Sequence, residues 1–116
     1  MADVTEAQFD EHALLVSQLE TLYREIEKIG SKKPGEVLPH SIAKKINHLV
    51  KLMRMSVGKE PFLDAIEPLG EDDLSFPGYG EAVVVLGELR GVMARRWNSK
   101  PFRVARRARG EPLSEF

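Results

Sequence analysis

The fold is decided by residues 14–29, which read LLVSQLETLYREIEKI. Apolar side chains recur in this stretch at alternating spacings of four and three residues, at Leu15, Leu19, Leu22, Ile26 and Ile29. That spacing is a heptad seam, which places the five side chains on one side of an α-helix. Thr5 is a suitable N-cap and Gly30 a suitable stop, so the sequence predicts a helix over residues 5–29.

Two further long helices and a short one follow from the same reasoning. Apolar residues at helical spacing predict a helix over residues 39–57. Pro61 opens a short segment whose apolar residues favour one or two helical turns over residues 62–66. Residues 79–97 include a β-branched run that is compatible with a strand. Because the apolar stripe continues through this segment at helical spacing, we predict a helix there as well.

The predicted fold class is therefore all-α, a small bundle of three long helices and one short helix. We expect this helical bundle domain to occupy residues 1–100, and 116 residues leave room for one such domain. Residues 101–116 are rich in arginine and are predicted to form a basic, extended C-terminal tail. Residues 70–80 have no apolar period and contain several turn-forming residues, so they are predicted to be a long loop.

Composition excludes several classes of protein. Cysteine is absent, which excludes disulfides, thiolate metal sites and cysteine nucleophiles. No stretch approaches the roughly 20 apolar residues of a transmembrane helix, so no membrane partner is predicted. Residues 1–6 are acidic and lack the basic and apolar regions of a signal peptide, which favours a cytoplasmic location.

The charge is nearly balanced in total but comes in four blocks of alternating sign. The 17 basic and 18 acidic residues give a formal net charge of −1. Residues 1–31 and 60–89 are predominantly acidic, whereas residues 32–59 and 90–116 are predominantly basic. Neighbouring elements of opposite sign attract each other, and a basic face left exposed attracts polyanions. The alternative is that most of these charges only solvate outward faces.

No pattern of residues predicts catalysis, a metal or a cofactor. The histidines are His12, His40 and His48, and none belongs to a Glu-x-x-His or His-Glu-x-x-His motif. His12 falls on the seam of the first helix, where a buried or interfacial histidine is the ordinary explanation. Residues 78–80 read Gly-Tyr-Gly before a helix, but no strand precedes them, so a turn is favoured over a nucleotide loop. We therefore expect no enzyme, no cofactor and no small-molecule substrate.

The favoured function is a non-enzymatic protein-interaction module that self-associates or forms a small subunit of a larger assembly. Gly87 and Gly91 lie four residues apart in the last helix, and each weakens a helix by about 1 kcal/mol relative to alanine. A close helix contact at that face would explain them. The predicted contact residues are Leu15, Leu19, Leu22, Ile26, Gly87 and Gly91. The seam is equally compatible with the interior of an intramolecular bundle.

Nucleic-acid binding is the alternative function. Residues 90–109 hold eight basic residues and no acid, with Trp97 and Phe102 among them. Arginine neutralises phosphates and aromatic rings stack on bases. The candidate contacts are Lys44, Lys45, Arg95, Arg96, Trp97, Arg103, Arg106 and Arg107. The most informative observation is whether Arg95, Arg96 and Arg103 form a continuous exposed strip. Burial of these arginines against Asp72 and Asp73 would instead favour a structural role.

Overall fold

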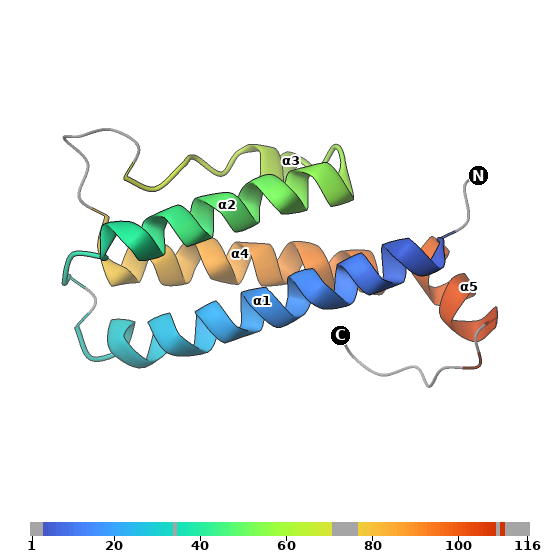
Figure 1. Cartoon of the computed structure of the whole chain (residues 1–116), viewed down its shortest axis with the longest axis horizontal. Helices are drawn as coiled ribbons and strands as arrows, with labels where there is room; N and C mark the ends of the chain where they lie inside the picture. The colour runs from blue at the N-terminus through green and yellow to red at the C-terminus, as the bar shows by residue number, and fades with distance from the viewer. Residues whose placement is uncertain (1–3, 34, 71–76, 109, 111–116) are drawn as a thin grey trace.

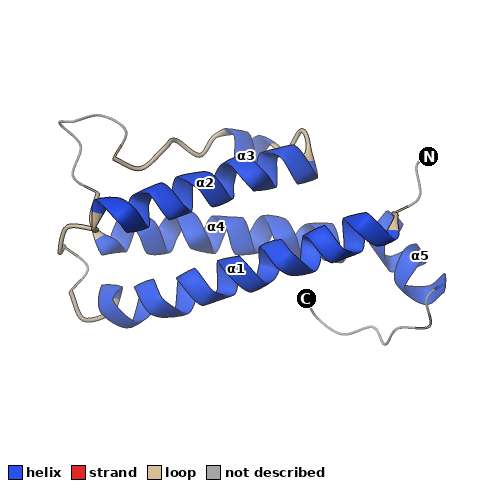
Figure 2. Cartoon of the chain, in the orientation of Figure 1, coloured by secondary structure: helices blue, strands red, loops and turns tan. Residues whose placement is uncertain are grey.

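The structure is a computed structural model that describes residues 4–33, 35–70, 77–108 and 110. It contains five helices, which are α1 (Glu6–Gly30), α2 (His40–Val57), α3 (Pro61–Asp64), α4 (Tyr79–Trp97) and α5 (Lys100–Ala108). No strand is present in these described ranges, as Figure 2 shows, so the predicted all-α class is confirmed. None of the helices in the same ranges is long and apolar enough to cross a membrane.

The three long helices lie side by side along the long axis of a molecule measuring 48 × 26 × 19 Å. Figure 1 shows that α1 runs opposite to α2 and α4, which are parallel to each other. Residues 65–70 after α3 therefore run back along α2 (Figure 1). Two backbone hydrogen bonds fasten the start of α4 to the loop before α2, from Leu38 N to Pro77 O at 2.8 Å and from Tyr79 N to Glu36 O at 3.0 Å.

The seam of α1 lies inside the bundle of a single chain. Leu15, Leu19 and Ile26 are at most 4% exposed and belong to one apolar cluster with residues of α2 and α4. Leu22 is half-buried against the same cluster, whereas Ile29 is 41% exposed. Leu15, Leu19 and Ile26 therefore pack within the bundle of a single chain, whereas Leu22 keeps part of its surface exposed.

The glycine that permits a close helix contact is Gly30, not Gly87 or Gly91. A Cβ atom at Gly30 would lie 3.0 Å from Cγ2 of Val83, so α1 ends in direct contact with the first turns of α4. Gly87 has nothing within 4 Å of such an atom. Gly91 has only the Nη1 atom of Arg95, at 3.4 Å. The described residues thus make no close helix contact at these two positions.

Helix ends follow the sequence closely at α1 and differ beyond α4. Thr5 caps α1 as predicted, because its hydroxyl accepts a hydrogen bond from Gln8 N while Gln8 Oε1 accepts one from Thr5 N. The start of the predicted C-terminal tail is helical rather than extended, since residues 100–108 form α5. Helix α5 lies across the end of the bundle and buries Phe102 and Arg106. Residues 71–76, with Asp72 and Asp73, and residues 111–116 lie outside the described ranges.

Candidate binding surface on α2

The arginine-rich segment is largely part of the end of the bundle. Arg106 is 2% exposed, its guanidinium lies 4.3 Å from the centre of the Trp97 ring, and its Nη2 atom donates to Trp97 O at 2.9 Å. Arg96 is half-buried and donates from Nη1 to Ser56 Oγ at 2.8 Å. Its guanidinium also lies 4.9 Å from the centre of the Phe102 ring. These two arginines stabilise the junction between α4 and α5.

Trp97 belongs to an aromatic cluster that closes this end of the molecule. Its ring stacks on His12 at 5.3 Å and meets the rings of Phe9 and Phe102 at 6.2 Å each. His12 is 3% exposed, as the seam position predicted, and neither of its ring nitrogens has a hydrogen-bond partner. Burial, and then the charges of Arg96 and Arg106, lower the pKa of His12 to about 4. Trp97 is therefore a packing residue and not an open stacking platform.

The remaining arginines of α4 are paired with acids. Arg95 lies 3.3 Å from Glu60 and above the ring of Phe62, and Arg90 lies 2.8 Å from Glu20. The Glu60 pair joins the acidic block 60–89 to the basic segment, as charge alternation suggested. Arg103 and Arg107 are exposed on α5, whereas Arg96 in the last turn of α4 is half-buried. Within the described part of α4 and α5, Arg95, Arg96 and Arg103 therefore do not form a continuous exposed strip.

Helix α2 carries a different kind of basic surface. Lys44, Lys45, His48 and Lys51 are all exposed, and their spacing places them on one side of the helix; we call them the basic face. Helix α2 contains no aspartate or glutamate. The ion pairs Arg90–Glu20 and Arg95–Glu60 involve no lysine of the basic face. This face therefore keeps its positive charge toward solvent.

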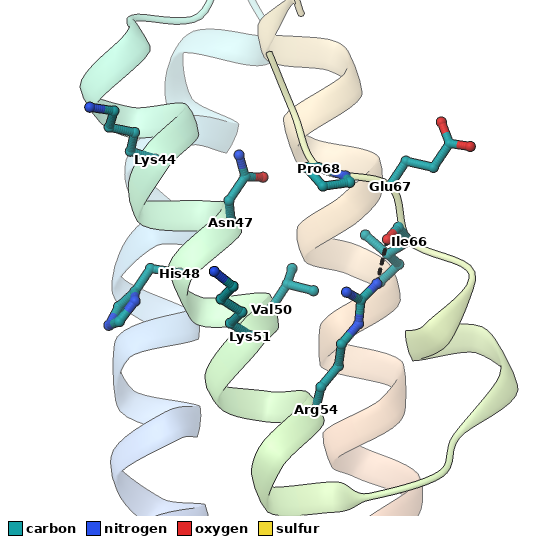
Figure 3. A pocket seen from close by; sticks show the side chains of 9 residues that line it. All are labelled: Lys44, Asn47, His48, Val50, Lys51, Arg54, Ile66, Glu67 and Pro68. Carbon is teal, nitrogen blue, oxygen red and sulfur yellow. Dashed lines mark hydrogen bonds between the residues drawn. The ribbon is translucent and has the colours of Figure 1, made fainter. Parts of the chain in front are cut away.

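A pocket of about 350 Å³ lies between α2 and the returning segment 66–69; we call it the α2 pocket. Figure 3 shows the residues that line it, which are Lys44, Asn47, His48, Val50, Lys51, Arg54, Ile66, Glu67 and Pro68. Glu67 is the one acid among them, and its carboxylate points away from α2. The wall opposite α2 is formed by residues 66–68, and Ile66 and Pro68 are its apolar part.

Two polar side chains of α2 hold the returning segment in place. Asn47 donates from Nδ2 to Leu69 O and accepts at Oδ1 from Leu69 N, both at 2.8 Å. Arg54 donates from Nη2 to Ile66 O at 2.6 Å and to Leu63 O at 3.3 Å. The pocket is thus a fixed feature of the fold. Sequence reasoning missed Asn47, although a polar residue between Ile46 and Val50 on an apolar stripe was a usable signal.

A groove of about 360 Å³ flanks the basic face on its other side, between α1 and α2. Helix α1 contributes only uncharged residues to it, which are Ser17, Gln18, Thr21 and Leu22. Helix α2 contributes Lys45, His48 and Leu49, so His48 lines both the groove and the α2 pocket. The basic face is therefore bordered on both sides by depressions that contain apolar side chains.

The described residues include no cluster of three or more histidine, aspartate or glutamate side chains suited to a metal ion. Comparison of the chain with protein-family models, with curated proteins and with solved structures finds no match.

Proposed function

We propose that the chain is a non-enzymatic protein-interaction module whose basic face on α2 docks an acidic segment of a partner protein. The observation that carries this proposal is the unpaired charge of Lys44, Lys45 and Lys51 on a helix without acids. On α4 and α5, Arg90, Arg95 and the buried Arg106 are engaged within the chain, whereas Lys100, Arg103 and Arg107 are exposed. A surface charge that no internal group compensates favours an oppositely charged partner.

An acidic polypeptide fits this surface better than a nucleic acid does. The candidate nucleic-acid residues divide between two distant places, because the first turns of α2 lie at the end of the bundle opposite α5 (Figure 1). Three of them, Arg96, Trp97 and Arg106, belong to the aromatic end cluster. The depressions beside the basic face contain Leu22, Leu49 and Pro68, which suit the apolar side chains of a peptide.

Self-association through the heptad seam has no support, since that seam is buried in the monomer. We therefore propose that the partner is a different protein, with an acidic segment that binds the basic face of α2.

The test removes three charges from α2 and, in a matched control, three charges from α5. We expect Lys44→Gln/Lys45→Gln/Lys51→Gln to weaken binding to fluorescent poly-L-glutamate about tenfold or more at low salt. The control is Lys100→Gln/Arg103→Gln/Arg107→Gln, whose three side chains are also exposed. Fluorescence anisotropy measures the dissociation constant of each triple variant for poly-L-glutamate. We expect the control to change that constant less than about twofold.

Two outcomes would overturn the proposal. Equal losses in the two triple variants would mean that only the total charge matters. Binding to single- or double-stranded oligonucleotides in the absence of binding to poly-L-glutamate would replace it with phosphate-backbone recognition.

A further inference from the structure

The α2 pocket has an excess of about two positive charges. Lys44, Lys51 and Arg54 line it from one helix, and Glu67 is its one acid. A carboxylate carries a single negative charge, whereas a phosphate monoester carries about −1.5 to −2 at pH 7. The charge of the pocket therefore matches a phosphate monoester more closely than it matches an aspartate or glutamate side chain.

Arg54 supplies a charge that is held in position and is not neutralised. Its Nη2 atom bonds to two backbone carbonyls, which fix the guanidinium without cancelling its charge. Its Nε atom is buried and has no hydrogen-bond partner. The guanidinium is half-buried, so an anion beside it is attracted more strongly than an anion beside a fully solvated cation. This is the electrostatic arrangement of a preorganised anion site.

The side chains differ in direction. In Figure 3 the ammonium of Lys51 lies beside Asn47, and the second terminal nitrogen of Arg54 points toward Val50. The carboxylate of Glu67 and the ammonium of Lys44 both point outward. The volume of about 350 Å³ lies within the range of small-ligand sites, about 300–1,000 Å³, and exceeds that of a phosphate group alone. Val50, Ile66 and Pro68 offer apolar surface to the organic part of an ester.

We propose that the α2 pocket binds a phosphorylated side chain of the partner protein, with phosphotyrosine as the best fit because its ring can cover the apolar part of the wall opposite α2. Lys51 would pair with the phosphate oxygens, Arg54 would supply the fixed charge, and Lys44 would add positive charge at the edge of the pocket. This inference rests on the proposed function, because it names the chemical group of the partner protein that binds in the α2 pocket.

The test compares a pentapeptide of four glutamates around a central phosphotyrosine with its unphosphorylated counterpart. Isothermal titration calorimetry gives both dissociation constants, and we expect phosphorylation to tighten binding about tenfold or more. Lys51→Gln should reduce that ratio at least about fivefold. Lys45→Gln removes an equal charge from the same face but lines the other groove, so it should weaken both peptides alike and leave the ratio unchanged. Glu67→Gln should raise the affinity for the phosphopeptide about twofold.

The outcomes separate this inference from the proposed function. Equal binding of the two peptides, still sensitive to the triple variant of α2, would overturn the phosphate site and leave the proposed function standing. Failure of both peptides to bind would overturn both proposals. An equal effect of Lys45→Gln and Lys51→Gln on the ratio would show general electrostatics and no pocket. Phenyl phosphate binding as tightly as the phosphopeptide would overturn the assignment to a partner protein.

Discussion

Replacing Leu19 with alanine should lower the free energy of unfolding by about 3 kcal/mol. Leu19 is 0% exposed and lies in the apolar cluster that joins α1, α2 and α4. Truncation to alanine removes buried methyl and methylene groups and leaves a cavity that helices packed on both sides cannot readily fill, which typically costs 2–5 kcal/mol. Urea unfolding followed by circular dichroism measures the loss.

The same experiment decides whether the seam acts within one chain. Because Leu19 is buried in the monomer, we expect the thermal unfolding midpoints of the native protein and of the Leu19→Ala variant to be independent of protein concentration over a hundredfold range. A seam shared between chains would instead raise the midpoint with concentration, by mass action. Leu14→Ala is the matched control, since Leu14 lies on the same helix but is 58% exposed and should cost well under about 1 kcal/mol. A concentration-dependent midpoint would contradict the assignment of the seam to the monomer.

The helices were predictable because their signals are local. The alternation of apolar residues in residues 14–29 and the cap at Thr5 act within a few turns, and both are confirmed. The β-branched run of α4 was compatible with a strand, but the apolar residues that continue beyond it at helical spacing indicated a helix. The structure confirms this, since α4 spans the predicted residues Tyr79–Trp97. The close contact at Gly30 was not predictable, because it depends on which turn of another helix lies opposite, here that of Val83.

The misinterpretation of the C-terminal segment has a physical reason. Arginine is usually exposed, so a run of arginines predicts a solvated or polyanion-binding segment. The guanidinium is also flat and weakly hydrated, which allows it to be buried against an aromatic face. Arg106 and Trp97 use that property, and Phe102, one helical turn before Arg106, packs beside them. The spacing of Phe102 and Arg106 was the available signal for a helix there.

The candidate site was only half predictable for a related reason. Lys44 and Lys45 fall outside the apolar stripe of α2, so their exposure followed from the pattern. The opposite wall of the α2 pocket comes from segment 66–69, which the fold brings back along α2 after a reversal of the chain. Asn47 and Arg54 specify that return by bonding to backbone groups, and such bonds leave no periodic signature.

Acidification should destabilise the protein by about 3 kcal/mol through His12 alone. Its pKa is about 4 in the folded state, against an ordinary value of 6.5 in the unfolded chain. Since the unfolded state binds a proton more readily, the stability contributed by the neutral ring is fully present above pH 6.5. It is lost progressively as the pH falls from 6.5 toward 4, and the pKa difference sets the size of the loss. The physical cause is burial of the ring between aromatic side chains and two guanidinium groups, with no acceptor for a second proton.

The His12→Phe variant isolates this contribution from that of the carboxylates, which also titrate below pH 5. Phenylalanine suits a site whose walls are the rings of Phe9, Trp97 and Phe102. It has no nitrogen that could bind a proton. At pH 7 the variant should be at least as stable as the native protein, because it removes two buried nitrogens without partners. At pH 4 its advantage should have grown by about 3 kcal/mol, as measured by urea unfolding at each pH. An advantage that stays constant between pH 7 and pH 4 would contradict the burial of a neutral His12, and with it the position of α5 over the end of the bundle.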